Sequence, residues 1–376
     1  MRILGLCQGA NLEIFEEFCN LISSEEELEK IGIFVADAFY FKNNYEKKKL
    51  PIKGVFYLKE WETIKKGLSR SYNQNYLDEK QKLLGAPSLR YGILADRRLI
   101  FGKYCKSTQS YKTKFSNDQL LGILEETIVR VESFLDEIKP DVIIGFAPVT
   151  LHEYIFLRYA EKRQIKVRLL RSLKIKNFVT FFDSLYGLPK KIKNIIDDKQ
   201  YTFSTESVQD IEEYLNQTIA SGANYEGMHQ TDYSLASFNI LRIFLGLFSS
   251  IKNEMKKFFT SESRNDNHNP GFMIPYLYDQ IINPIRAKRT RKFIKKIYGQ
   301  KLDTNQKYCF YPMHFEPEIA LQLYARPIQN QIEIIRTISN ALPPGQVLVV
   351  KEHPRSAGHR KLSYYKKLSE IPNIIL

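Results

Sequence analysis

Two histidine-containing segments near the end of the 376-residue sequence carry residue types that bind phosphate. The first segment contains His314, Glu316 and Glu318 and follows an aromatic run at 308–311. The second contains Lys351 and His353 and follows an apolar run at 347–350. Imidazole and ammonium groups that converge at strand tips suit the phosphate of a nucleotide sugar. The glutamates could orient a sugar hydroxyl or act as a base. The alternative is a pair of ordinary strand-to-helix turns with structural histidines.

These segments resemble the capsule polysaccharide biosynthesis protein family, which includes Kdo transferases of capsule assembly. The shared pattern is an aromatic strand, Pro-Leu-His-x-x-Pro-Glu, a helix and then Lys-Glu-His-Pro. In this sequence it covers about residues 308–354 and departs by Met313 in place of Leu, while residues 141–182 match more loosely as an acceptor-side half. The resemblance implies a GT-B fold, in which the C-terminal domain holds the donor nucleotide sugar in a cleft that faces the N-terminal domain.

Carried over by position, the resemblance makes His314, Glu318, Lys351 and His353 the donor-site candidates. His314 and Glu318 take the catalytic role, and Lys351, His353 and Glu316 take the nucleotide-sugar-binding role. In the family, a turn rich in Thr, Ser or Gly normally follows and enters a helix whose N–H groups would hold phosphate. The sequence ends at Leu376 before such a turn, so we expect a truncated chain or one that has lost full activity.

Three residues of the first half are candidates for the opposite wall of the cleft. Gly9 and Asn11 follow the first predicted strand and are expected to line the cleft, although Gly9 could serve only as a tight turn. His152 lies near a predicted helix start, where it could contact the acceptor or be a core or capping histidine. The six histidines show no metal-ligand spacing. We therefore expect no metal. We also expect no cofactor, and we favour a CMP-linked sugar as the substrate.

The elements that must position these residues alternate between strands and helices. In the first half, the predicted strands are 3–7, 31–36, 141–146 and 167–170, with weaker candidates at 55–58 and 91–94, and the predicted helices are 12–30, 116–138 and 151–163. In the last part, the predicted strands are 308–311, 347–350 and 373–376, and the predicted helices are 330–342 and 358–369. Strand, helix and strand with short connections indicate parallel sheets covered by helices.

The predicted fold class is therefore α/β and GT-B-like, with two Rossmann-like domains that have parallel sheets and are joined by a helical connection. The expected boundaries are 1–186 for the N-terminal, acceptor-side domain, 187–303 for the connection and 304–376 for an incomplete C-terminal, nucleotide-sugar domain. In parallel sheets, ligands bind beyond the carboxyl ends of the strands. Both histidine segments occupy that position.

The connection contains a basic helix and an apolar segment. Of the eighteen residues 284–301, eight are Lys or Arg and none is acidic. The candidates for an anionic surface are Arg286, Lys288, Arg289, Arg291, Lys292, Lys295 and Lys296. They could rest on anionic lipid headgroups beside a lipid-linked acceptor, or they could form the solvated face of an interdomain helix. Residues 238–259 are the most apolar segment, and we expect a core helix there rather than a membrane anchor.

The composition suits an anionic partner in a reducing compartment, and the charge suits a solvated basic surface without such a partner equally well. Lys and Arg number 56 against 42 Asp and Glu, a formal charge of +14, and a positive field attracts nucleotides, anionic glycans and membranes. The four cysteines form no C-x-x-C pair, and we interpret them as reduced core residues. The sequence opens directly on a strand pattern with no signal-peptide pattern, so we expect a cytoplasmic protein that could lie at the inner face of the membrane.

The first hypothesis is a glycosyltransferase that moves a sugar from a nucleotide-sugar donor to a bacterial capsule or lipopolysaccharide glycan, with a glycan or lipid-linked acceptor. The second is a nucleotide-sugar epimerase or a polyol-phosphate transferase on the same fold. The third is a non-catalytic scaffold protein of capsule assembly. A specific nucleic-acid partner is not expected, because no RRM, KH or helix-turn-helix signature accompanies the charge.

Overall fold

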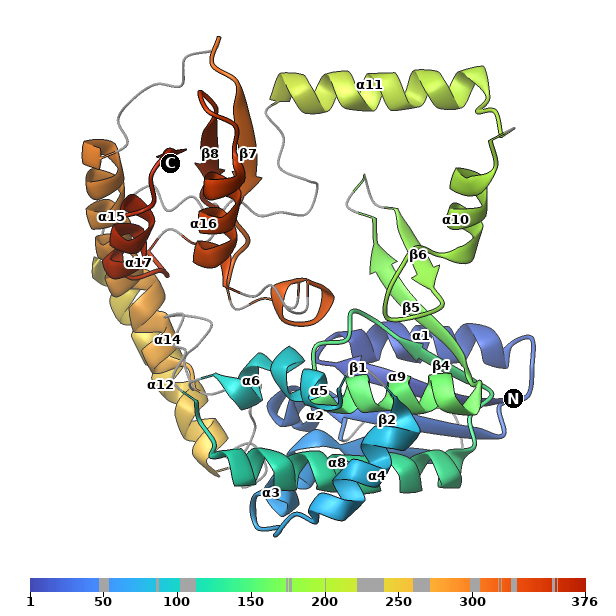
Figure 1. Ribbon diagram of the computed structural model, residues 1–376. Helices are drawn as coiled ribbons and strands as arrows, with labels where there is room; N and C mark the ends of the chain where they lie inside the picture. Colours follow the sequence, from blue (N-terminus) through green and yellow to red (C-terminus); the bar gives the residue numbers. More distant parts are fainter. Residues whose placement is uncertain are drawn as a thin grey trace.

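The computed structural model contains two β-sheets with helices packed around them (Figure 1). It describes residues 1–46, 54–85, 88–101, 113–173, 175, 178–199, 201–221, 240–259, 271–297, 305–316, 318, 320–325, 330–353, 356 and 358–376. Cys105 and the end of the predicted basic helix, 298–301, lie outside these residues.

The first sheet has six strands in the order β3-β2-β1-β4-β5-β6. The strands are β1 (Arg2–Gln8), β2 (Lys30–Ala36), β3 (Val55–Lys59), β4 (Val142–Gly145), β5 (Lys166–Ser172) and β6 (Val179–Phe182). The first five are parallel, as the sequence predicts, whereas β6 pairs antiparallel with β5. The sheet is therefore mixed. The prediction of a purely parallel sheet missed this edge strand, which needs only a short connection back along β5.

Helices cover both faces of the first sheet because its strands alternate their side chains. Ile3 and Cys7 pack against α1 (Asn11–Ser23) and α2 (Ala38–Asn44), while Leu4 and Leu6 pack toward α8 (Asn117–Ile138) and α9 (Leu151–Arg163). The period of two along a strand produces this separation into two cores. The remaining helices of this part are α3 (Glu60–Leu68), α4 (Gln74–Leu84), α5 (Arg90–Ala95) and α6 (Arg97–Ile100).

Two helices that the sequence predicts well begin with capping boxes. The Ser116 hydroxyl accepts a hydrogen bond from the Gln119 N–H at the start of α8, and Thr150 does the same with Glu153 at the start of α9. Such reciprocal caps satisfy N–H groups that have no partner within the helix. By contrast, the predicted strand at 91–94 is wrong: these residues belong to α5. A run of four apolar residues is too short for its periodicity to distinguish a strand from a helix.

The second sheet has three parallel strands in the order β7-β8-β9. Its elements are β7 (Tyr308–Pro312), the short π-helical segment η2 (Ala320–Tyr324), α16 (Gln331–Ala341), β8 (Val347–Lys351), α17 (Leu362–Ser369) and β9 (Ile374–Ile375). A separate core forms around Ile335, Leu348 and Tyr365, each fully buried. All three strands predicted from the sequence are confirmed here.

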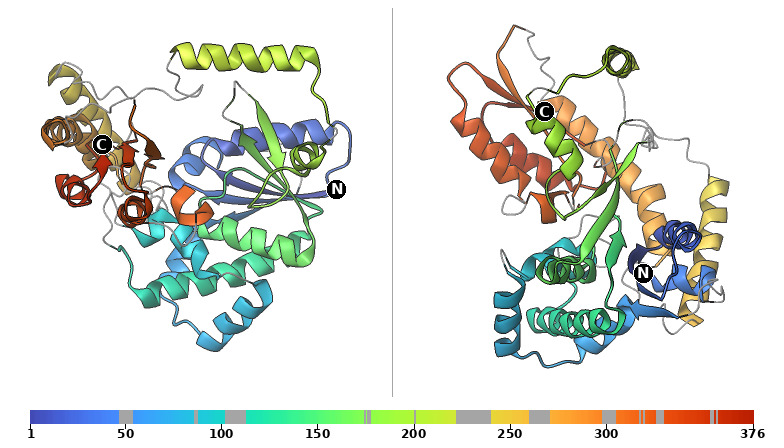
Figure 2. Two further views of the ribbon diagram at one scale, coloured as in Figure 1. Left: turned by 45° about the horizontal axis from the view of Figure 1, so that its top comes forward. Right: turned by 90° about the vertical axis from the view of Figure 1, so that its right-hand side faces the viewer.

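Helices connect the two sheets along the chain. The first two are α10 (Lys190–Asp197) and α11 (Thr205–Ser221), and a column of helices follows, made of α12 (Ile240–Phe259), α14 (Met273–Leu277), the π-helical η1 (Tyr278–Ile282) and α15 (Asn283–Ile297). The Phe272 ring meets the Phe39 ring of α2 at 5.3 Å, and Phe293 and Ile294 pack against the core of the second sheet. The views in Figure 1 and Figure 2 show α12, α14 and α15 running past both sheets, with α11 standing apart from them.

The prediction that residues 238–259 form a core helix is wrong. The segment is helical in α12, but eight of its large apolar side chains are more than 40% exposed: Leu241, Phe244, Leu245, Phe248, Ile251, Met255, Phe258 and Phe259. Sequence apolarity alone does not indicate burial, because a docking surface has the same composition as a core.

Candidate functional site

The two predicted histidine segments leave the second sheet side by side. β7 and β8 are parallel and in register through Pro312 and Lys351, and the Met313 N–H donates to the Lys351 carbonyl oxygen at 2.8 Å. His314 and His353, each two residues beyond the last paired position of its strand, therefore emerge at the same edge. This is the carboxyl edge of the sheet, where ligands of parallel sheets bind.

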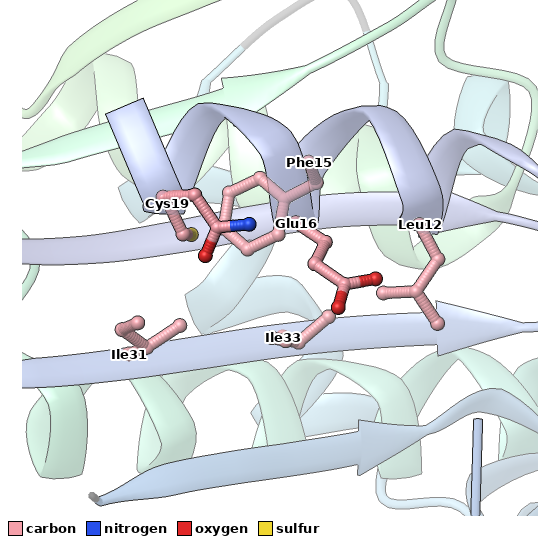
Figure 3. A pocket seen from close by; sticks show the side chains of 7 residues that line it. Leu12, Phe15, Glu16, Cys19, Ile31 and Ile33 are labelled. Carbon is pink, nitrogen blue, oxygen red and sulfur yellow. The ribbon is translucent and has the colours of Figure 1, made fainter. Parts of the chain in front are cut away.

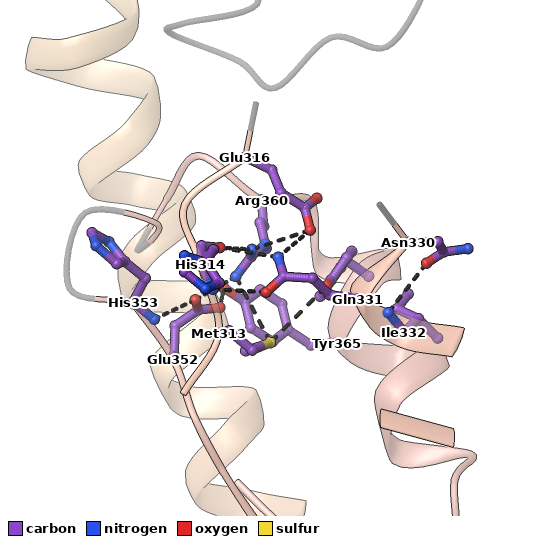
Figure 4. A network of polar contacts seen from close by, with 11 residues as sticks. Met313, His314, Glu316, Asn330, Gln331, Ile332, Glu352, His353, Arg360 and Tyr365 are labelled. Carbon is purple, nitrogen blue, oxygen red and sulfur yellow. Dashed lines mark hydrogen bonds and ion pairs between the residues drawn. The ribbon is translucent and has the colours of Figure 1, made fainter. Parts of the chain in front are cut away.

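A buried arginine fastens the two loops to each other. The Arg360 side chain is fully buried, its Nη2 donates to the His314 carbonyl oxygen at 2.6 Å, and its Nη1 donates to the Glu352 carboxylate (Figure 4). Burial alone would lower the pKa of Arg360, but the charges of Glu352 and Glu316 raise it above its ordinary value. The guanidinium is therefore a permanent cation inside the protein.

Gln331, the first residue of α16, completes this network. Its side-chain oxygen accepts a hydrogen bond from the His314 N–H at 2.7 Å, and its amide nitrogen donates to the His314 carbonyl oxygen at 3.0 Å and to the Glu316 carboxylate. Glu352 also accepts a hydrogen bond from the Tyr365 hydroxyl at 2.7 Å. Gln331 of α16 and Tyr365 of α17 thus hold the two loops in place. A site whose loops are supported in this way is preorganised.

The network divides the predicted site residues into two groups. Glu316 is 9% exposed and turns inward, where its carboxylate lies 3.6 Å from Nη2 of Arg360. His314 and Lys351 are exposed, and His353 and Glu318 are partly exposed. The structure brings His314, Lys351 and His353 to one edge of the sheet, whereas Glu318 lies farther along the chain, just before η2. Glu316 belongs to their support rather than to the surface that a ligand would touch.

On the first sheet, Gly9 and Asn11 lie at the carboxyl end of β1. Gly9 adopts a left-handed φ of 50° in the turn that leads into α1, a conformation that favours glycine. Asn11 is the first residue of α1. Gly9 therefore has the tight-turn role that the sequence offered as an alternative, and both residues occupy the predicted edge.

His152 is a core histidine in this structure. Its side chain is 1% exposed, and its ring stacks on the Phe34 ring at a centroid distance of 5.0 Å. The predicted contact between His152 and an acceptor is not compatible with this burial. The physical reason is its position inside the first turn of α9, which faces the sheet and not the solvent.

Sequence reasoning missed a buried polar cluster next to His152. The Glu153 carboxylate accepts hydrogen bonds from the Gln8 amide at 2.6 Å and from the N–H groups of Val149 and Thr150 at 2.8 and 2.9 Å. Burial raises the pKa of Glu153 to about 7, against the lowering effect of these bonds. The Thr150-x-x-Glu153 spacing is a capping-box signal that could have located the residue, though not its burial.

Arg98 and Asp96 extend this cluster. Nε of Arg98 lies 3.1 Å from the Asp96 carboxylate, which also accepts a hydrogen bond from the Leu151 N–H at 3.2 Å. Burial would lower the pKa of Arg98, but Asp96 and Glu60 raise it above its ordinary value. The Asp96 carboxylate therefore connects the start of α6 with the start of α9.

The segment after the first histidine loop contacts this edge of the first sheet. In η2, Leu323 is fully buried within the core of the first sheet, and the Tyr324 ring lies 5.4 Å from the Arg171 guanidinium and 6.3 Å from the Tyr186 ring. The loop with His314 and Glu318 is therefore anchored at both ends, on β7 and on the first sheet. The carboxyl edge of the second sheet is thereby connected directly to the first sheet.

A small cavity between α1 and β2 is not a substrate site. It measures about 10 Å³, enough for about one water molecule, and is lined by Leu12, Phe15, Glu16, Cys19, Asn20, Ile31 and Ile33 (Figure 3). Within the described ranges, no group of three His, Cys, Asp or Glu side chains is arranged to hold a metal ion. Among the same residues, no helix is long and apolar enough to span a bilayer.

The predicted basic helix is confirmed as α15, and most of its cations face solvent. The exposed ones are Lys288, Arg289, Arg291, Lys292, Lys295 and Lys296, while Arg286 is partly buried with its guanidinium 5.5 Å from the Tyr278 ring. An anionic surface for these residues stays a prediction.

Comparison with solved structures shows distant structural likeness. The chain is similar to UDP-GlcNAc 2-epimerase from Neisseria meningitidis, a structure bound to UDP-GlcNAc, with 12% sequence identity over 100% of this chain and 71% of that chain, at a TM-score of 0.23. At that TM-score the likeness carries no argument about function. No protein-family profile matches the sequence, and no curated protein matches it. The resemblance of residues 308–354 to the capsule family therefore stays a prediction.

Proposed function

We propose that the protein is an enzyme that binds a nucleotide sugar at the carboxyl edge of the second sheet and transfers the sugar to a bacterial capsule or lipopolysaccharide glycan. The observation that carries the proposal is the pairing of His314 with the Lys351–His353 turn on adjacent parallel strands, held by the buried Arg360. Lys351 and the two imidazoles would neutralise the phosphate of the donor, because ammonium and imidazole groups bind phosphate oxygens as charge-assisted donors.

Preorganisation supports a catalytic use of these side chains. Catalysis needs donors that already point at the position where charge develops, so that little reorganisation is required during the reaction. The backbone of His314 is fixed by Gln331 and Arg360, and the His353 N–H donates to Glu352 at 2.6 Å. In this proposal, Lys351 and His353 stabilise the departing nucleotide phosphate, and His314 or Glu318 handles the donor sugar or a proton.

Binding of CMP-, UDP-, GDP- and CDP-linked sugars tests the proposal by thermal shift. A ligand at about 100 times its Kd stabilises a folded protein by about 2.7 kcal/mol, which is readily measured. We expect one nucleotide class to raise the melting temperature, and we expect Lys351→Ala and His353→Ala to remove that effect. Lys367→Ala is the matched control, because it deletes an exposed cation of α17 outside the two loops.

The two variants also decide between a ligand-binding and a structural role. Loss of the nucleotide-induced shift with an unchanged melting temperature of the ligand-free protein supports the donor site. No shift with any of the four classes, or an equal loss in Lys367→Ala, would contradict it. Product analysis with a labelled donor then distinguishes the reactions: transfer requires a glycan acceptor, whereas conversion of the donor sugar without an acceptor would establish an epimerase instead.

A further inference from the structure

The outward face of α12 is more apolar than its inward face. The exposed stripe consists of Leu241, Phe244, Leu245, Phe248, Ile251, Met255 and Phe259, spaced at intervals of three and four residues, so that they share one side of the helix. Phe248 is 69% exposed and Phe259 is 76% exposed. An ordinary surface helix has the opposite arrangement, with its apolar stripe toward the core.

The inward face of α12 is fixed by small and polar residues. Gly246 lies against α14, because a Cβ atom there would come within 2.0 Å of the Tyr276 hydroxyl. The Glu254 carboxylate accepts hydrogen bonds from the N–H groups of Phe272 and Met273, both at 3.1 Å. These contacts hold the rotation of the helix, so the apolar stripe is a fixed feature of the surface.

The charges beside the stripe are positive. Lys252 is exposed and lies on the same face as Phe248 and Met255, four residues after one and three before the other. Glu254, the one acidic residue of α12, is turned inward. In the same column of helices, α15 exposes six cations and contains no Asp or Glu.

Helix α11 provides an internal comparison. It also exposes apolar residues at helical spacing, namely Val208, Ile211, Leu215 and Ile219, but its charged residues are all acidic: Glu206, Asp210, Glu212 and Glu213. An anionic surface would repel α11 and attract α12, because the potential of such a surface acts on the sign of the nearby charges. The two helices therefore differ in the sign of the charges beside their exposed apolar residues.

We propose that α12 is an interfacial docking helix, whose apolar stripe inserts among the headgroups and upper acyl chains of an anionic lipid bilayer. Amphipathic helices with bulky apolar residues on one face and lysines beside them bind such interfaces in the plane of the membrane. The cations of α15 add attraction at longer range. This proposal does not depend on the proposed sugar transfer and needs no nucleotide for its test.

Flotation with lipid vesicles tests the docking helix. The chain is mixed with phosphatidylcholine vesicles that contain about 30 mol % phosphatidylglycerol, and bound protein is recovered in the floating layer. We expect the unchanged protein to float with these vesicles and to stay unbound with pure phosphatidylcholine. The double variant Phe244→Ser/Phe248→Ser should bind the vesicles at least about tenfold more weakly, because two phenylalanines contribute most of the inserted area.

Ile211→Ser/Leu215→Ser on α11 is the matched control and should float like the unchanged protein. Lys252→Glu is a second variant at an exposed position that leaves every core contact intact, and it should weaken flotation several-fold. Absence of flotation by the unchanged protein, or equal loss in the α11 control, would overturn the proposal. So would a dimer that the α12 substitutions convert to monomer without affecting flotation, because the stripe would then bind a second copy of the chain.

Discussion

At the level of single residues, Glu153 couples stability to pH. Its carboxyl group is fully buried in the first turn of α9, and its pKa is raised to about 7 by burial. In the unfolded chain the same group has an ordinary pKa, so between the two values the folded protein binds the proton that the unfolded chain has released. The stabilisation that the Glu153 carboxyl group provides is complete at pH values below its pKa in the unfolded chain. It is lost as the pH rises through the higher pKa of this group in the folded protein.

We therefore expect the free energy of unfolding to fall by roughly 3 kcal/mol between about pH 4.5 and pH 7 on account of Glu153. Glu153→Gln keeps an oxygen that accepts the three N–H hydrogen bonds but cannot ionise, so this part of the pH dependence should disappear. Urea unfolding at several pH values measures both proteins. A Glu153→Gln protein with the same slope as the unchanged protein would show that another group is responsible.

The roles of individual site residues were only partly predictable from sequence. The histidines and Lys351 could be placed at strand tips because the runs before them are plainly strands. The inward turn of Glu316 could not be predicted, because its partner Arg360 lies beyond the next strand and looks like a surface residue in sequence. A buried carboxylate depends on such long-range pairing, which local spacing does not encode.

At the level of elements, two glycines allow α3 and α8 to pack closely. A Cβ atom on Gly122 would come within 2.5 Å of the Gly67 carbonyl oxygen, and a Cβ atom on Gly67 would come within 2.5 Å of the Ile123 Cα atom. Both obstacles are backbone atoms, which cannot move aside as a side chain can. The glycines set the distance between these helices, and α8 in turn packs against the sheet.

Gly122→Ala should lower the free energy of unfolding by about 1–3 kcal/mol, even though alanine is the better helix former. Ser133→Ala, on an exposed position of the same helix, should change it by less than about 0.5 kcal/mol. Denaturant unfolding of both variants provides the measurement. If Gly122→Ala proved as stable as the unchanged protein, the close approach of the two helices would not exist in solution.

Elements with strong local signals were predicted correctly, and those without such signals were missed. The capping box and the periodic apolar residues located α8 and α9, and the apolar runs located β1, β2, β7 and β8. The edge strand β6 alternates exposed and partly exposed residues and has no buried run to reveal it. The orientation of α12 depends on which of its faces the neighbouring elements cover. Sequence periodicity predicts an apolar face, but it does not predict whether that face is buried or exposed.

At the level of the whole molecule, η2 contributes a leucine to the core of the first sheet. Leu323 comes from the last part of the chain, yet it belongs to the core of the first sheet and is fully buried there. Next to it, Arg171 lies 4.6 Å from the Phe182 ring and 5.4 Å from the Tyr324 ring. The domain boundaries at 186 and 303 stay a prediction, and Leu323 is a residue of the third segment that packs into the core of the first.

Leu323→Ala should destabilise the protein by about 2–5 kcal/mol, the usual cost of truncating a buried leucine. The effect should appear in the unfolding transition of the first sheet, which the fluorescence of Trp61 reports because its ring packs in that part of the molecule. Tyr308→Ala, at a half-exposed position of β7, is the control and should leave the Trp61 transition in place. An unchanged Trp61 transition in Leu323→Ala would show that η2 does not contribute to the first core.

The burial of Leu323 in the first sheet also has a consequence for synthesis on the ribosome. Domains usually fold in the order in which they emerge, and β1 to β6 are complete long before residue 323 is made. Until η2 leaves the exit tunnel, the nascent first sheet has an open apolar gap beside α5 where Leu323 will sit. We therefore expect the early half of this chain to expose apolar surface to nascent-chain chaperones until η2 has been synthesised.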